Sequence, residues 1–353
     1  MHTPHSKTPI THTDSSEYSK LSEYLHADFP LSELLERANQ QTLAHFSTFD
    51  QKTQSIRRRI RLFAPLYVGN FCVNHCRYCG FQHDHTIERI HLTQEEVRQE
   101  LDVLERRGFK NILVVAGENP QKCTPEYFAE ICREIIRRGM NPSVEIAPQT
   151  INGYRILTEN GCRSITLFQE TYDPELYKNY HPRGPKSSFT WRYETYTRAG
   201  TAGFDFFGFG FLLGLAPPLE EMERMITQAK KLQAEFPLTG ISFSLPRIRT
   251  APLGFHPPYP VSDDLFIRMY CALRLIFPEA ELVLSTRETE EMRNLLYKTC
   301  ITYTSAGSQT APGGYHAEET GYFSGEQFPT TDNRSVSQII QWLNSENIIA
   351  DFS

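Results

Sequence analysis

The 353-residue sequence contains no apolar run that approaches the roughly 20 residues a membrane-spanning helix requires. The polar N-terminus, MHTPHSKTPITHTDSSEYSK, lacks the apolar segment of a secretory signal. Lys and Arg number 36 against 42 Asp and Glu, a net charge of −6, so no positive excess indicates nucleic acid or an anionic membrane as a partner. These absences predict a cytoplasmic protein that acts on neither membranes nor nucleic acids.

The sequence also lacks a paired cysteine framework of the kind that disulfide-stabilised secreted proteins carry. Its eight cysteines fit a reducing cytoplasm, and five of them are scattered and expected to be small buried hydrophobes. Hydrophobic residues make up 39% and charged residues 22%, which is typical of a globular chain. Residues 1–30 are polar and expected to be disordered. Residues 31–353 are expected to form one barrel domain with an N-terminal helical extension and a C-terminal tail.

Apolar strand patterns alternate with helical patterns along the rest of the chain. Eight such units predict a closed (β/α)8 TIM-type barrel, an α/β fold with a parallel sheet. The alternative is an open doubly wound sheet, but no G-x-G-x-x-G follows the first strand. The predicted strands are Ala64–Asn70, Asn111–Ala116, Ser143–Ala147, Ser164–Phe168, Phe206–Leu213, Gly240–Leu245, Glu281–Leu284 and Ile301–Thr304.

Helix signals lie between these strands. Thr93 and Glu96 form a capping-box pattern, and Thr124 followed by Pro125 starts another helix. An amphipathic pattern over residues 31–49 predicts a helix before the first strand.

The segment LYVGNFCVNHCRYCGF, residues 66–81, holds Cys72, Cys76 and Cys79 in a C-x3-C-x2-C spacing. Asn and Gly residues interrupt it, so it reads as a loop. Three thiolates can hold three irons of a four-iron, four-sulfur cluster and leave the fourth iron open to a ligand that is not protein. The alternatives are three thiols buried on one helix face, or zinc bound together with His75 or His83.

Active sites of such barrels lie at the carboxyl ends of the strands, so polar residues there are candidates. Carboxylates bind ammonium groups and ribose hydroxyls, and a guanidinium binds a carboxylate through two parallel hydrogen bonds. Acidic residues and arginines at the strand ends therefore suit an amino-acid ligand beside an open iron. Taken singly, each residue is equally explained as a cap partner, a surface charge or a turn. The candidates are Glu118, Glu145, Glu170, Arg247, Arg249, Arg287, Ser305 and Ser308.

The cysteine spacing, with an aromatic residue before the last cysteine, resembles the radical S-adenosylmethionine (SAM) superfamily. The motifs QETY, WRYET, PRIR, STRE, SAGS, PGGY and EQFPTTDNRS, in that order, resemble its aromatic amino-acid lyases. The resemblance is strongest to the tyrosine lyases of thiamine thiazole synthesis, the 2-iminoacetate synthases. Similar lyases of hydrogenase maturation carry a second cysteine cluster after the barrel. Because no cysteine follows Cys300, the resemblance favours the thiazole branch.

The resemblance implies two cofactors, a [4Fe–4S] cluster and SAM. The cluster would be held by Cys72, Cys76 and Cys79. The SAM-binding residues would be Tyr78 beside the adenine, Glu118 at the amino group, Glu145 and Glu170 on the ribose side, and Arg192 at the carboxylate.

The resemblance also implies an amino-acid substrate, tyrosine, whose Cα–Cβ bond is cleaved to give 2-iminoacetate and p-cresol. Tyr67, Arg287 and Ser305 would anchor it, with Arg287 on its carboxylate and Ser308 close by. The implied partners are an external one-electron donor such as flavodoxin or ferredoxin, and a thiazole synthase.

Three functions remain as alternatives. They are a lyase that acts on tryptophan or another aromatic substrate, a radical SAM synthase that joins carbon atoms, and a zinc-binding barrel without redox chemistry. The chain departs from the family pattern at His85, at Thr250 in PRIRT and at Tyr303. These departures bear on the side chain of the substrate rather than on the fold.

Overall fold

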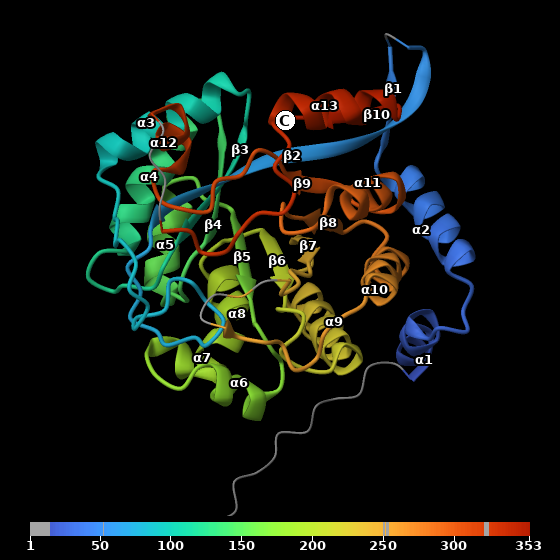
Figure 1. Cartoon of the computed structure of the whole chain (residues 1–353), viewed down its shortest axis with the longest axis horizontal. Helices are drawn as coiled ribbons and strands as arrows, with labels where there is room; N and C mark the ends of the chain where they lie inside the picture. Colours follow the sequence, from blue (N-terminus) through green and yellow to red (C-terminus); the bar gives the residue numbers. More distant parts are fainter. Residues whose placement is uncertain (1–14, 52, 250, 252–253, 321–324) are drawn as a thin grey trace, which may run out of the picture.

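The structure is a computed structural model, which describes residues 15–51, 53–249, 251, 254–320 and 325–353. A ten-stranded sheet forms its centre. Strands β2 to β9 are parallel neighbours in chain order, and β9 pairs back onto β2, which closes a barrel (Figure 1). The strands are β1 (Ser47–Asp50), β2 (Ser55–Gly69), β3 (Asn111–Ala116), β4 (Asn141–Glu145), β5 (Ser164–Phe168), β6 (Phe206–Gly210), β7 (Gly240–Ser244), β8 (Glu281–Leu284), β9 (Tyr303–Ser305) and β10 (Ile348–Asp351).

Helices surround this barrel and connect its strands (Figure 1). The (β/α)8 prediction is therefore confirmed, and each of the eight predicted strands overlaps a strand of the barrel. The helices are α1 (Ser15–Leu25), α2 (Leu31–His45), α3 (Gln94–Arg106), α4 (Pro125–Arg137), α5 (Ile151–Glu159), α6 (Pro174–Tyr180), α7 (Phe189–Tyr193), α8 (Thr195–Thr201), α9 (Pro218–Glu235), α10 (Asp263–Ile276), α11 (Glu290–Thr299), α12 (Gly314–Thr320) and α13 (Val336–Ser345).

Local capping fixes where several of these helices begin. At α3, the Thr93 side chain accepts a hydrogen bond from the Glu96 amide while the Glu96 carboxylate accepts one from the Thr93 amide. At α4, Thr124 caps the helix and Pro125 occupies its first position. Both starts agree with the sequence prediction because a cap is a local interaction between neighbours in the chain.

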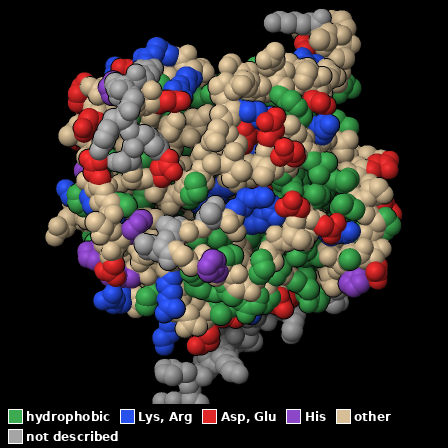
Figure 2. Space-filling model, in the orientation of Figure 1, with side chains coloured by type: hydrophobic (Ala, Val, Ile, Leu, Met, Phe, Trp, Pro, Cys, Tyr) green, Lys and Arg blue, Asp and Glu red, His purple; other side chains and the backbone are tan. Residues whose placement is uncertain are grey.

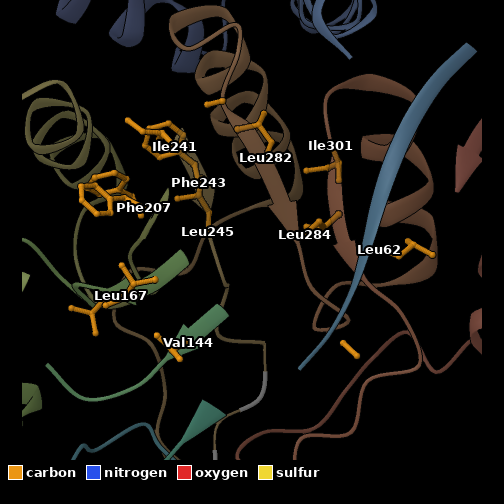
Figure 3. Packing of buried hydrophobic residues seen from close by; sticks show 14 of the residues in the cluster. Leu62, Val144, Leu167, Phe207, Ile241, Phe243, Leu245, Leu282, Leu284 and Ile301 are labelled. Atoms are coloured by element: carbon orange, nitrogen blue, oxygen red, sulfur yellow. The ribbon is translucent and has the colours of Figure 1, made fainter. Parts of the chain in front are cut away.

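The hydrophobic core lies between the outer face of the sheet and the helices. Figure 3 shows part of it, with Val144, Leu167, Phe207 and Ile241 on successive strands β4 to β7. Each of these side chains is at most 5% exposed, so each contributes roughly 1.5–3 kcal/mol of burial free energy. The residues that alternate with them point into the barrel, and several of these are serine, threonine or glycine.

The helix expected over residues 31–49 ends earlier, at His45. Ser47–Asp50 is instead strand β1, which pairs antiparallel with the first part of β2. Strand β2 is 15 residues long, so it extends beyond the barrel and offers an edge there. An apolar residue such as Phe49 suits a helix or a strand, and only the pairing partner decides between them.

Part of the N-terminal segment differs from the expectation of disorder over residues 1–30. Helix α1 lies within it, and Leu21 and Tyr24 are 2% and 6% exposed. The guanidinium of Arg268 on α10 donates hydrogen bonds to the carbonyl oxygens of Tyr24 and Phe29 at 3.4 and 2.9 Å. Composition alone did not reveal this docking contact. Residues 1–14 lie outside the described residues.

Acidic and basic side chains are interspersed over the face shown in Figure 2. No helix in the described part of the chain is long and apolar enough to cross a membrane.

Candidate active site

The cysteine-bearing segment forms a loop after β2 and is organised around one arginine. Arg89 donates to the carbonyl oxygens of Asn70 at 2.7 Å, Phe81 at 2.8 Å, Gln82 at 2.6 Å and His85 at 2.9 Å. These bonds bring the two ends of the loop together. The sequence prediction missed Arg89, which lies outside the cysteine motif.

The three cysteines of this loop face one cavity of about 90 Å³ at the mouth of the barrel. Cys76 is buried, and Cys72 and Cys79 are partly buried. The cavity brings together all four acidic and basic residues expected to bind SAM, and it adds three polar residues that were not expected. Its charged and amide lining residues are Glu118, Glu145, Glu170, Arg192, Lys186, Asn74 and Gln327.

Glu170 follows β5 with a backbone φ of +71°, a conformation that non-glycine residues rarely adopt and that is common at functional sites. Its carboxylate lies 2.6 Å from Nζ of Lys186 and 3.4 Å from Nη2 of Arg192. Burial opposes ionisation, but the two cations lower the pKa of Glu170 below its ordinary value. The arrangement therefore places two positive charges around one carboxylate.

Glu145 lies at the end of β4, between the cysteine cavity and the barrel interior. Burial and repulsion by Glu170 raise the pKa of Glu145 to about 7. Glu118 accepts a hydrogen bond from Nδ2 of Asn74 at 2.6 Å, and the same amide lies 3.7 Å from Sγ of Cys72. Asn74 thus joins the cysteine loop to the end of β3.

Tyr78 is held by a histidine that the sequence prediction did not single out. The Tyr78 hydroxyl lies 2.7 Å from Nε2 of His181, whose Nδ1 lies 2.8 Å from the carbonyl oxygen of Tyr177. Burial lowers the pKa of His181 to about 3, so its ring is neutral at physiological pH. Nδ1–H then donates to the carbonyl, and Nε2 accepts from Tyr78, which fixes the tyrosine ring.

Beneath the cysteine cavity, the barrel encloses a second cavity of about 340 Å³. Tyr67, Arg287, Ser305 and Ser308, the four residues expected to bind or lie near the substrate, all line it. Its volume falls in the range of about 300–1,000 Å³ that is typical of small-molecule sites. The polar upper end of this cavity adjoins Glu145 and therefore the first cavity.

Arg287 is the cation of this second cavity. Burial lowers its pKa, and within the described residues no carboxylate forms an ion pair with its guanidinium, which lies 3.3 Å above the ring of Phe328. Stacking leaves the edge of a guanidinium available for a carboxylate. Arg287 is therefore arranged to receive an anionic group.

Arg247 and Arg249, expected to be candidates, have another role. Both guanidiniums lie 2.6 Å from the Glu288 carboxylate, which is 2% exposed. This cluster joins the loop after β7 to the loop after β8. It holds the segment that carries Arg287. Because both arginines are paired with Glu288, neither is available to bind an anionic ligand in the cavity.

The mouth of the barrel is closed by the chain near residue 327, which the sequence prediction treated only as a motif. Gln327 accepts a hydrogen bond from the Tyr67 hydroxyl at 2.8 Å, and its carbonyl oxygen accepts one from the Gly80 amide at 3.3 Å. Buried Asp332 anchors this segment to Arg293 at 2.5 Å. The motif EQFPTTDNRS was the only signal for these contacts.

Known proteins with similar sequences identify the family. Residues 66–229 match the model of the radical SAM superfamily, and residues 244–349 match that of the Biotin and Thiamin Synthesis associated domain. The 2-iminoacetate synthase of Salmonella typhimurium is 32% identical over 84% of this chain and 80% of its own length. The chain belongs to the radical SAM superfamily, in the family of the 2-iminoacetate synthases. This radical SAM protein is also 31% identical to the 2-iminoacetate synthase of Escherichia coli, over 84% of the chain and 80% of that protein.

Solved structures agree with this membership. The crystal structure of HydG, a maturase of the [FeFe]-hydrogenase, superposes with a TM-score of 0.84 and 31% identity, over 98% of this chain and 78% of that one. Methylornithine synthase (PylB), at 19% identity and a TM-score of 0.73, shares the fold.

Proteins of this radical SAM family use a [4Fe–4S] cluster and SAM. The donor set fits the cluster, because three thiols line one cavity and an amide and a lysine border it. Burial raises the pKa of Cys76 and Cys79, so iron would have to displace a proton from each sulfur. Among the described residues, no three His, Cys, Asp or Glu side chains form a group that could hold a single metal ion.

Proposed function

We infer that this protein is a radical SAM lyase that cleaves the Cα–Cβ bond of tyrosine, giving 2-iminoacetate and p-cresol for thiamine thiazole synthesis. The observation that carries this inference is Arg287, a half-buried guanidinium that pairs with no carboxylate among the described residues and lines the barrel cavity below the three cysteines. Sequence similarity to the 2-iminoacetate synthases supports the choice of reaction.

The three thiolates of Cys72, Cys76 and Cys79 would hold the cluster, and the ring of Tyr78 would pack against the adenine of SAM. Glu118, Glu145, Glu170 and Arg192 line the same cavity and would bind the amino, ribose and carboxylate groups of SAM. When bound, this pair of cofactors supplies a carbon-centred radical that takes a hydrogen atom from the substrate.

The protein controls which hydrogen atom is taken by holding the substrate in one position. Arg287 would bind the substrate carboxylate in a fork, with Tyr67 and Ser305 beside it and Ser308 near. This fork turns the amino group, rather than the aromatic ring, toward the upper cavity. The Gln327 segment covers the opening and limits the access of water.

We also propose an external one-electron donor such as flavodoxin or ferredoxin, and a thiazole synthase that receives the product. Each of these proposals rests on the family resemblance. A cytoplasmic location is proposed because all eight cysteines are free thiols, as expected in a reducing compartment.

The test is anaerobic reconstitution, followed by reaction with SAM, a reductant and tyrosine. The expected products are 5′-deoxyadenosine, p-cresol and 2-iminoacetate, the last measured as glyoxylate. Arg287→Ala should lose ~2–5 kcal/mol of substrate binding, which is roughly 30-fold or more in product formation, while the brown colour of the cluster persists.

Arg224→Ala is the matched control, because it removes an arginine of α9 that pairs with Asp173 and lines neither cavity. Product formation at the original rate by Arg287→Ala would overturn the substrate assignment. Turnover of tryptophan with no turnover of tyrosine would assign the enzyme to the alternative substrate.

A further inference from the structure

The barrel interior is unusually hollow where its middle strands meet. Interiors of such barrels are normally filled by layers of bulky branched side chains. Here the inward positions on β5, β6 and β7 are Thr166, Gly208 and Ser242, which lie side by side in register. All three line the 340 Å³ cavity. The missing bulk leaves space below Arg287.

Glycine is required at the centre of this row. A Cβ atom added at Gly208 would meet Oγ1 of Thr166 and lie 3.1 Å from Oγ of Ser242. The two hydroxyls therefore approach each other across the glycine, on one wall of the cavity.

Among the described residues, these two hydroxyls have no hydrogen-bond partner. Across the described ranges of the chain, neither Thr166 nor Ser242 forms a side-chain hydrogen bond, although Ser242 is only 5% exposed. Other hydroxyls of the same wall are satisfied, since Ser143 donates to the carbonyl oxygen of Ile112 at 3.1 Å and Ser244 bonds with Tyr270. Thr166 is half-buried and both residues line the open cavity, so their hydroxyls are available to a polar group brought in by a ligand.

The opposite wall is aromatic and apolar apart from Arg61, whose guanidinium lies 4.6 Å from the centroid of the Tyr303 ring. The rings of Phe63 and Tyr303 lie 4.6 Å apart at their centroids, and Leu113 and Val115 continue this wall. A cavity with one apolar wall and one hydroxyl wall suits a flat ring that carries a polar substituent at its far end.

The distance between this row of residues and Arg287 suits an amino acid with such a ring. Ser242 pairs with Glu281 at the start of β8, while Ser285 and Arg287 follow the end of that strand. The four residue steps from Glu281 to Ser285 span roughly 13 Å along the strand. That separation admits an aromatic amino acid whose carboxylate lies on Arg287 and whose ring points down the barrel.

We propose that Thr166 and Ser242 form the subsite for the hydroxyl group of the substrate ring and so select tyrosine over phenylalanine. This inference rests on the proposed function and adds its side-chain specificity. A site built to hydrogen-bond a substrate hydroxyl rejects the analogue that lacks it, because its own polar groups are then left unpaired.

The test is equilibrium dialysis of the anaerobically reconstituted enzyme with SAM and without reductant, against labelled tyrosine and labelled phenylalanine. The wild-type protein should bind tyrosine at least about tenfold more tightly, equal to ~1.4 kcal/mol. Thr166→Val keeps the shape and removes the hydroxyl. The double variant T166V/S242A should bind the two amino acids equally, and retained phenylalanine binding reports that the site is folded.

Ser143→Ala is the matched control, because its hydroxyl lines the same cavity but is already satisfied by Ile112. It should leave the ratio of the two affinities unchanged. An unchanged ratio in both T166V and S242A would overturn the subsite and leave the tyrosine lyase assignment intact. If Tyr303→Phe loses the preference for tyrosine while T166V and S242A keep it, the proposed subsite would be overturned, because the substrate hydroxyl would then bind at the opposite wall.

A third outcome separates the two proposals. If the wild-type enzyme binds neither amino acid and forms no p-cresol, the lyase assignment fails, and the subsite fails with it.

Discussion

Around Glu170, two cations, Lys186 and Arg192, share one carboxylate at the edge of a cavity that Glu118 and Glu145 also line. Lys186 reaches Glu170 at 2.6 Å and also lies 5.8 Å from the ring centroid of Tyr78. Its backbone amide is fixed by Oδ1 of Asn74 at 2.9 Å. Lys186 therefore links the cysteine loop, the adenine-side tyrosine and the acidic group of the site.

We predict that Lys186→Met weakens SAM binding by about tenfold or more, because one of the two cations that could meet the SAM carboxylate is lost. The measurement is a dialysis titration of reconstituted protein with SAM, with the absorption of the cluster as the check on loading. Lys122→Met is the control, since Lys122 lies over Phe71 of the same loop but does not line the cavity. Equal SAM affinity in the two variants would contradict the prediction.

A second prediction concerns Glu221 on α9, which is 1% exposed and accepts a hydrogen bond from the Tyr172 amide at 2.6 Å. Burial raises the pKa of Glu221 from 4.5 to about 7. The folded state therefore keeps this proton up to about pH 7, whereas the unfolded state releases it near pH 4.5. Stability from this group is present below about pH 4.5 and is lost as the pH rises through 7.

A shift of that size corresponds to ~3 kcal/mol. Urea unfolding at pH 5 and pH 8 should therefore show a larger decrease for the wild-type protein than for Glu221→Gln, which cannot titrate. A parallel pH dependence in the two proteins would mean that Glu221 titrates normally.

At the scale of elements, the cysteine loop is held by close contacts between backbones. A Cβ at Gly117 would lie 2.5 Å from the carbonyl oxygen of Phe71 and 3.3 Å from Cβ of Cys72. A Cβ at Gly80 would lie 2.5 Å from the carbonyl oxygen of Gln327. The end of β3 and the Gln327 segment thus both press on the loop.

Gly117→Ala should displace Cys72 and reduce iron incorporation during reconstitution, since overpacking of this kind costs ~1–3 kcal/mol. Iron per chain and the absorption near 400 nm measure the effect. Gly153→Ala, in helix α5, is the control, because its nearest atoms belong to the side chains of Gln149 and Pro125. Full cluster content in Gly117→Ala would show that the loop tolerates the shift.

The sequence revealed those parts of the structure that depend on local pattern. The eight barrel strands and the caps at Thr93 and Thr124 were predicted because apolar alternation and capping involve neighbours in the chain. Strands β1 and β10 were missed because short edge strands are defined by their partner β2 rather than by their own residues.

The candidate site shows the same division. Residues within recognisable motifs, such as Arg287 and Glu145, line the expected cavities. Lys186 was missed because it lies in an irregular loop between two motifs, and the path of such a loop follows from tertiary contacts. The row of Thr166, Gly208 and Ser242 was missed because it requires the register of three strands.

At the scale of the whole molecule, two family models divide a barrel that is structurally continuous. The first ends at residue 229, within the part of the chain that follows β6, and the second begins at Ser244, at the end of β7. Yet β6 pairs with β7 and β9 pairs with β2. The two segments therefore share one sheet.

The N-terminal helix α1 is attached to the barrel through Arg268 of α10, which is 3% exposed. Arg268→Ala should lower the free energy of unfolding by ~1–3 kcal/mol, because two carbonyl oxygens lose their donor and α1 loses its anchor. Thermal unfolding of the full chain measures this change. Arg98→Ala, which breaks only an exposed pair with Glu95, should stay within ~0.5 kcal/mol of the wild-type protein.

The pairing of β2 has a consequence for biosynthesis. This strand leads into the cysteine loop, but its neighbours include β9 and β10, which are synthesised after the rest of the barrel. A nascent chain therefore exposes its three thiols before the walls that shelter them exist. Iron delivery to this protein should accordingly follow the synthesis of β9, and a chain stalled before that strand should present the thiols unprotected to oxidants.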